Sequence, residues 1–147
     1  MITETHGDSG YLKTWRPPHQ AQAWWSAGYS TGHAGIGILV NPAFLAKFSQ
    51  PPHWKDIWKG RAGRLRLAGD QGVLDLVVSY FPTGTGVPSE ADTYGAPARS
   101  GSYDNWPALR HALRHRIASS LDSATSALRV LGGISIGFPA RRTVGAM

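Results

Sequence analysis

Cysteine is absent from the 147-residue chain, which excludes disulfide bonds, a disulfide-linked partner and thiolate metal sites. No apolar run approaches the ~20 residues that a membrane-spanning helix needs. The N-terminus also lacks the charged and apolar segments of a signal peptide. From these absences we predict no membrane partner and an intracellular location, in the cytoplasm or the nucleus.

Acidic residues are scarce relative to basic ones. Nine Asp and Glu stand against 15 Lys and Arg, so the net charge is +6 and the pI is about 10.1. Such an excess favours association with a polyanion, most simply a nucleic acid, although it says little about the fold. The length suits one domain with a sizeable core.

The strongest strand signal lies in residues 60–82 and predicts a β-hairpin. Arginine and leucine alternate from Arg64 to Leu67, a period of two that is typical of a half-buried strand. Gly69-Asp70-Gln71-Gly72 then supplies turn residues. The β-branched and apolar residues 73–78 follow, as expected for a strand that is covered on both faces.

The second strand of this hairpin delivers a polar aromatic residue, Tyr80, to its C-terminal end, and Pro82 then ends the ladder. Open α/β sheets build their binding sites at such strand ends, which makes Tyr80 a candidate site residue. An ordinary hairpin with a capping tyrosine explains the same letters.

Residues 106–121 are predicted to form a helix that Asp104 or Asn105 caps, with proline in its first turn. Four apolar residues at intervals of four mark its buried stripe: Leu109, Leu113, Ile117 and Leu121. Two exposed basic ridges accompany it: Arg110 with Arg114, and His111 with His115. The histidine pair could ligate a metal, but no third ligand is near in sequence, and a solvated cationic face explains it better.

Other segments give coarser expectations. A short helix is predicted for residues 20–26, and a strand for 33–41, whose glycines leave one face as bare backbone. Residues 83–105, rich in Gly, Pro, Ser and Thr, are expected to form a mobile surface loop. Residues 127–133 are predicted to form a second buried strand, and 134–147 form an atypical tail with no clear period.

The N-terminal segment offers Glu4, His6 and Asp8, three potential metal ligands that alternate along the chain. A flexible polar terminus is the simpler explanation and needs no metal. Trp15, Trp24 and Trp25 are predicted to be core or lid residues, because stacking on bases would need them exposed beside basic residues.

Taken in order, these segments resemble the endonuclease/exonuclease/phosphatase family with the deoxyribonuclease I-like (DNase I-like) fold, especially its retroelement-type or uncharacterised members. The resemblance rests on four stretches: Glu4-Thr5-His6, similar to the family's Q-E-T-H; residues 35–40, similar to G-G-V-A-I-L; residues 60–82, similar to the hairpin from G-R to Y-x-P; and residues 106–133, similar to the elements before G-D-F-N.

The resemblance implies an α/β (α+β) fold, a partial DNase I-like sandwich in which a mixed sheet has helices on one face and its other face exposed. Residues 1–133 would be part of the family domain. The family's first asparagine would lie upstream of Met1, and its last motifs past Met147. The chain would then be an N-terminal fragment of a longer protein.

The tail departs from the family pattern, because Ile134-Ser135-Ile136 stands where Asp-Phe-Asn is expected. Residues 134–138 can be encoded by the codons ATT TCA ATT GGG TTC. Read with the preceding G in a frame shifted by one base, these become GAT TTC AAT TGG GTT, which encodes Asp-Phe-Asn-Trp-Val. Our hypothesis is that residues 134–147 come from a shifted frame. Different codons in the nucleotide sequence would reject it.

The resemblance also implies a Mg²⁺-dependent phosphoesterase or nuclease acting on a phosphoester, most simply in nucleic acid. Glu4 would bind the metal and Tyr80 would contact the phosphate. Arg61, Arg64 and Arg66 would attract the substrate, although exposed strand arginines are the simpler explanation. Most catalytic groups have no match here, so we expect an inactive chain; the alternative is a small basic nucleic-acid-binding module that uses arginines and tryptophans on one open face.

Overall fold

The computed structural model describes residues 1–3, 16, 20–28, 35–81, 105–122 and 127–134, with backbone alone at 122, 133 and 134. This part of the chain is α+β and mostly strand, with two sheets and two helices. One sheet contains β1 (Ile2–Thr3), β2 (Gln22–Ser26) and β3 (Ile36–Val40). The other contains β4 (His53–Trp58), β5 (Ala62–Gly69), β6 (Gly72–Tyr80) and β7 (Ala127–Ile134). The helices are α2 (Pro42–Leu45) and α4 (Trp106–Asp122).

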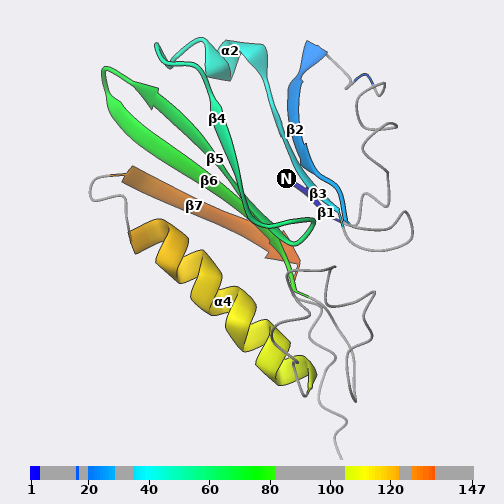
Figure 1. The fold of residues 1–147 in the computed structure, drawn as a ribbon. Coiled ribbons are helices and arrows are strands. Elements are labelled where there is room, and N and C mark those ends of the chain that lie inside the picture. The colour runs from blue at the N-terminus through cyan, green and yellow to red at the C-terminus, as the bar shows by residue number, and fades with distance from the viewer. Residues whose placement is uncertain (4–15, 17–19, 29–34, 82–104, 123–126, 135–147) are drawn as a thin grey trace, which may run out of the picture.

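The elements form three layers, and the four-stranded sheet is the middle one (Figure 1). The three-stranded sheet, in the order β1-β3-β2, covers one of its faces, and α4 lies along the other. Strands β4, β5 and β6 run antiparallel, whereas β7 runs parallel to β6, so the middle sheet is mixed. The mixed sheet was predicted, but the expected bare sheet face is wrong, because the second sheet covers it.

Two apolar clusters fill the spaces between these layers. The cluster between the sheets contains Ile36, Ile38, Leu65, Leu67 and Val78, all 0–2% exposed. In the cluster beneath α4, the apolar stripe of the helix packs on Ala62 and Val77 of the middle sheet. The stripe consists of Leu109, Leu113, Ile117 and Leu121. The predicted buried stripe of the helix is therefore confirmed.

The predicted hairpin and helix cap are also present. Strands β5 and β6 pair along their whole length and turn at Asp70 and Gln71, so that Gly69 lies opposite Gly72. Gly72 has a φ of +122°, which residues with a Cβ rarely adopt. At the start of α4, the Asn105 side chain accepts a hydrogen bond of 2.9 Å from the backbone N–H of Ala108, which satisfies one of the free donors of the first turn.

Residues 20–26 were predicted to form a helix, and this prediction is wrong: residues 22–26 form strand β2, paired with β3. Cross-strand packing explains the difference. Trp25 lies opposite Gly37, and a Cβ at Gly37 would overlap the Trp25 indole ring. The bare backbone face of β3 is thus covered by an aromatic side chain from the adjacent strand, a contact that a helix at 22–26 could not make.

Strand β7 forms where it was predicted and extends to Ile134, but the prediction that it is buried is wrong. Leu128, Val130 and Leu131 are 70%, 44% and 59% exposed. Its position at the edge of the middle sheet, with a neighbouring strand on one side only, accounts for this exposure. The predicted loop (83–105) and tail (134–147) lie outside the described residues, apart from Asn105 and Ile134.

Candidate functional site

Tyr80 is the last residue of β6, and its side chain is packed against an arginine. The backbone N–H of Tyr80 donates a hydrogen bond of 2.8 Å to the carbonyl of Arg61, just before β5. The Arg61 guanidinium carbon lies 4.6 Å from the centre of the Tyr80 ring, which is within cation–π range. Both residues are buried, with 5% and 8% exposure. A cation and a phenol are therefore held together at one end of the middle sheet.

The turn before Arg61 ties this end of the middle sheet to the other sheet. The N–H of Gly60 donates a hydrogen bond of 2.8 Å to the Ser26 hydroxyl, and its carbonyl accepts one of 3.0 Å from Gly35. Gly60 has a φ of +71°, and a Cβ there would lie 2.7 Å from the Cα of Gly28. Glycine is required at this position by both its conformation and the close approach of the two backbones.

The end of β1 lies at this same end of the sandwich. Thr3, its last residue, pairs with Ile36, the neighbour of Gly35 in sequence. The chain therefore leaves β1 toward the end where Arg61 and Tyr80 lie (Figure 1). Glu4, the predicted metal ligand, follows Thr3 directly but lies outside the described residues, as do His6 and Asp8.

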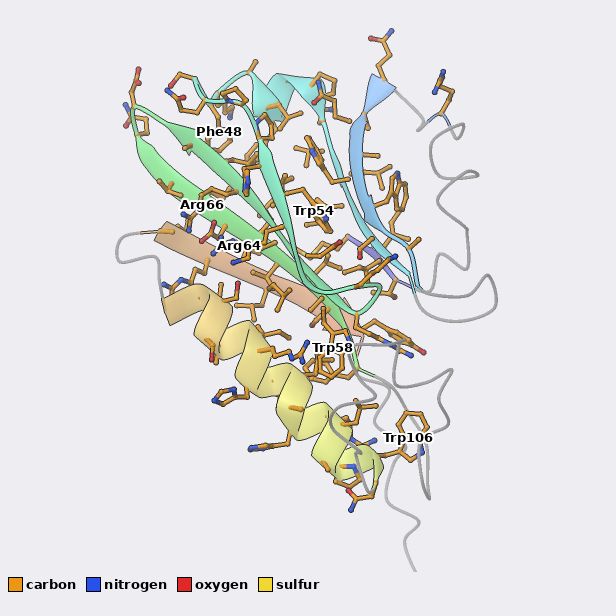
Figure 2. The ribbon with its side chains drawn as sticks, viewed as in Figure 1. Phe48, Trp54, Trp58, Arg64, Arg66 and Trp106 are labelled. Carbon is orange, nitrogen blue, oxygen red and sulfur yellow. The ribbon has the colours of Figure 1, made fainter. Side chains whose placement is uncertain are left out.

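Arg64 and Arg66 lie elsewhere, on the α4 side of the middle sheet, whereas Trp54 packs in the cluster on the opposite side (Figure 2). Arg66 donates two hydrogen bonds of 2.8 Å to the two carboxylate oxygens of Asp75, its partner across the hairpin. Such a two-pronged pair is strong and directional. Asp75 is completely buried, while the Arg66 side chain is 31% exposed.

Arg64 and Arg129 connect this ion pair to the end of the helix. Arg64 donates through Nη1 to the carbonyl of Ser120 at 2.9 Å, and Arg129 donates to the carbonyl of Leu121. Both carbonyls belong to the last turn of α4, where the helix dipole is negative and backbone acceptors lack intrahelical partners. The hydrogen bonds from Arg66 hold the pKa of Asp75 below its usual range, against the opposing effect of burial, and the charges of Arg66, Arg64 and Arg129 add to this lowering.

The three arginines predicted to attract substrate thus occupy two different places. Arg61 lies beside Tyr80, while Arg64 and Arg66 surround Asp75. The simpler explanation, exposed strand arginines, is wrong for Arg61 and Arg64, which are 5% and 6% exposed, because the layers on each side of the sheet cover them. Sequence reasoning missed Asp75, although a single carboxylate in an otherwise apolar strand was the available signal.

Four of the five described tryptophans pack into the protein interior, whereas Trp25 lies on the outer face of its sheet against Gly37. Trp15 lies outside the described residues. Trp58 and Trp106 belong to the cluster beneath α4, and Trp24 and Trp54 pack against the cluster between the sheets. A Cβ at Gly63 would overlap the Trp54 ring, as one at Gly37 would overlap Trp25. The prediction of core tryptophans is confirmed for Trp24. Among the described residues, no open face combines tryptophans with arginines.

Metal ligands do not gather in the described part of the chain, where no group of three or more His, Asp or Glu residues could hold an ion. The Arg61 guanidinium that packs on Tyr80 does not suit Mg²⁺, an ion that prefers carboxylate and phosphate oxygens. His111 and His115 are exposed on α4, as expected for a solvated face. Neither of the described helices is long and apolar enough to cross a membrane.

Comparison with known proteins leaves the structure as the main guide to function. No protein-family model matches the chain, and neither the curated proteins nor the solved structures that were searched contain a match.

Proposed function

We propose that this chain carries the metal-binding and phosphate-binding end of a Mg²⁺-dependent phosphoesterase or nuclease with the DNase I-like sandwich, and that these 147 residues alone hydrolyse nothing. In this proposal Glu4 binds Mg²⁺, and Tyr80 together with Arg61 contacts the phosphate. The substrate is a phosphoester, in nucleic acid by preference because the net charge is +6.

The observation that supports the proposal most directly is the meeting of two distant segments at one end of the sandwich. The last residue of β1 immediately precedes Glu4, and the last residue of β6 is Tyr80. Hydrogen bonds and strand pairing connect these two strand ends through Gly35, Gly60 and Arg61. The resemblance requires the same two strand ends to supply a metal ligand and a phosphate contact.

Arg61 gives this end a chemistry that suits a phosphate. Its guanidinium has a fixed charge and lies beside the Tyr80 ring, where burial strengthens electrostatic attraction to an anion. A bound Mg²⁺ would polarise the phosphate and stabilise the leaving oxygen. The described residues do not themselves form a magnesium site, so this ion would depend on Glu4 and on the phosphate.

We expect no hydrolysis because several of the family's catalytic groups have no counterpart in this sequence. A single carboxylate binds Mg²⁺ weakly, because the ion retains most of its waters unless several oxygen ligands replace them. The family's histidine–aspartate pair has no match in this sequence, and loss of a general base typically lowers rates by ~10²–10⁴-fold. Tyr80 and Arg61 can orient a phosphate but cannot activate water.

Metal binding by the chain itself is tested with Mn²⁺ as a paramagnetic substitute for Mg²⁺. We expect Mn²⁺ to broaden the NMR signals of Thr3 and Ile36 in the presence of phosphate, and the Glu4→Gln variant to lose this broadening. Asp70→Asn removes one negative charge from the exposed turn at the other end of the β5–β6 hairpin and should behave as the wild type. Broadening that is equal in both variants would reject Glu4 as the ligand.

Activity is tested on an extended protein that includes the flanking reading frame with the frame repaired. It should cut plasmid DNA or release phosphate in Mg²⁺, and Glu4→Gln should abolish this. The 147-residue chain should do neither. Cleavage by that chain in the presence of a chelator would overturn the metal assignment, and an inactive extended protein would overturn the proposed catalysis.

A further inference from the structure

A row of charged side chains crosses the middle sheet beside the C-terminal end of α4. The strand registers place His53, Arg66, Asp75 and Arg129 opposite one another on β4, β5, β6 and β7. Opposed residues in adjacent strands share a face of the sheet. Lys55 and Arg64 form a second opposed pair on that face. We call these six residues the basic ladder.

The basic ladder has an excess of positive charge. Lys55, Arg64, Arg66 and Arg129 contribute four charges, and the only carboxylate among the six is Asp75. Allowing about −0.5 for the end of the α4 dipole leaves about +2.5 among these groups. Arg64 donates to the neutral Ser120 carbonyl, which orients its guanidinium without cancelling its charge, and Arg129 donates to the Leu121 carbonyl.

Several members of the ladder reach solvent. His53, Lys55 and Arg129 are exposed, and the Arg66 side chain is 31% exposed. Arg64 is buried behind them, and its Nε lies 4.0 Å from the Asp75 carboxylate with no hydrogen-bond partner among the described residues. The exposed cations therefore lie directly beside buried ionic groups, which hold Arg66 in place.

We propose that the basic ladder binds the phosphate backbone of a nucleic acid duplex, with Lys55, Arg66 and Arg129 as the phosphate contacts. Four adjacent strands span about 14 Å, and duplex DNA carries one negative charge per about 1.7 Å of its axis, so a bound duplex would present several phosphates to the ladder. Arg64 and Asp75 would position Arg66 and would not contact the ligand.

This surface is separate from the proposed phosphoesterase site. Asp75 lies five residues before Tyr80 on β6, which is about 16 Å along an extended strand. The ladder includes neither Glu4 nor Tyr80, and its binding needs no metal. The effect of replacing Lys55 or Arg129 on binding in a chelator therefore tests the ladder, and the absence of that effect would leave the Glu4 and Tyr80 proposal unaffected.

The experiment measures fluorescence anisotropy of a labelled 20-base-pair DNA duplex with the 147-residue chain in EDTA over a series of salt concentrations. Three phosphate contacts predict a slope of log affinity against log salt near −2.7, since each contact contributes about −0.9. Lys55→Gln and Arg129→Gln should each weaken binding and bring the slope closer to zero by about 0.9.

Two control variants keep the proposal falsifiable. Lys47→Gln removes an exposed lysine just after α2, and Arg114→Gln removes an exposed arginine from the outer face of α4. Both should bind as the wild type does. Thermal melts of all four variants check that they fold. An equal change of slope in control and ladder variants, or an unchanged slope in folded Lys55→Gln and Arg129→Gln, would overturn the proposal.

Discussion

The two faces of the β5–β6 hairpin are both buried, but by different means. On one face, Leu65, Leu67 and Val78 pack against the three-stranded sheet, in a cluster whose buried members are apolar apart from the Tyr80 hydroxyl. On the other face, Arg66 pairs with a fully buried Asp75, beside the end of α4. On the apolar face, a substitution should lower the free energy of unfolding in proportion to the buried apolar area that it removes. The ionic face depends on one carboxylate for the charges around it.

The largest effect is expected on the ionic face. Asp75→Ala should lower the free energy of unfolding by about 4 kcal/mol, because removing one partner of a buried ion pair leaves the other charges uncompensated. Chemical denaturation would measure the loss. The control is Asp70→Ala in the exposed turn of the same hairpin, for which about 0.5 kcal/mol or less is expected. Equal losses would show that Asp75 is not required to compensate the arginines.

A smaller loss of stability is expected when a core side chain of α4, the helix that packs on the ionic face, is shortened. Leu113, 1% exposed, lies in the cluster between α4 and the sheet, so Leu113→Ala should cost about 3 kcal/mol through the lost contacts and the cavity. Its neighbour Arg114 is exposed over the Phe81 ring at 5.5 Å, and Arg114→Ala should cost about 0.5 kcal/mol or less. Similar thermal melts for the two variants would contradict the assigned faces of α4.

The smallest effect is expected from acid. The pKa of Asp75 is lower in the folded state than in the unfolded chain, where it is about 3.9. The ionised carboxylate therefore contributes its full stabilisation at pH values above the pKa of the unfolded chain. This contribution is lost as the pH falls through the folded-state pKa. The protonated carboxyl still fills its site, so the loss should be smaller than that of Asp75→Ala.

Unfolding curves at pH 6 and at pH 3 would measure the contribution of the Asp75 charge to the free energy of unfolding. The free-energy difference between the two pH values should be smaller in Asp75→Asn than in the wild type, since the amide does not titrate. Identical differences in the two proteins would mean that Asp75 contributes nothing to the acid sensitivity, and that its pairing with Arg66 does not lower its pKa.

Local sequence patterns were sufficient for the elements whose contacts lie close together in the chain. The hairpin was predicted from a period of two and four turn residues, and the helix from Leu109, Leu113, Ile117 and Leu121 at every fourth position. The cap at Asn105 acts on a backbone group three residues away. Each of these signals is contained in a few neighbouring residues, so the propensities and the final structure agree.

Contacts between distant segments decided the features that were predicted wrongly. Strand β2 forms because the bare backbone of Gly37 on β3 accommodates the Trp25 ring, and β7 is exposed because it lies at the edge of the middle sheet. In the candidate site, Tyr80 was found from its place at a strand end, but the sequence could not bring Arg61 to its ring or separate Arg61 from Arg64 and Arg66.

The hairpin, the buried stripe of α4 and the excess of positive charge can all be predicted from the order of the residues. The place where that charge is compensated depends on how the layers pack. Alternating arginines and leucines predict a strand with two different faces. They do not predict that other elements cover both faces, because the alternation depends only on neighbours in the chain. The second sheet and α4 supply that cover, and the strand register places Asp75 where Arg66 can reach it.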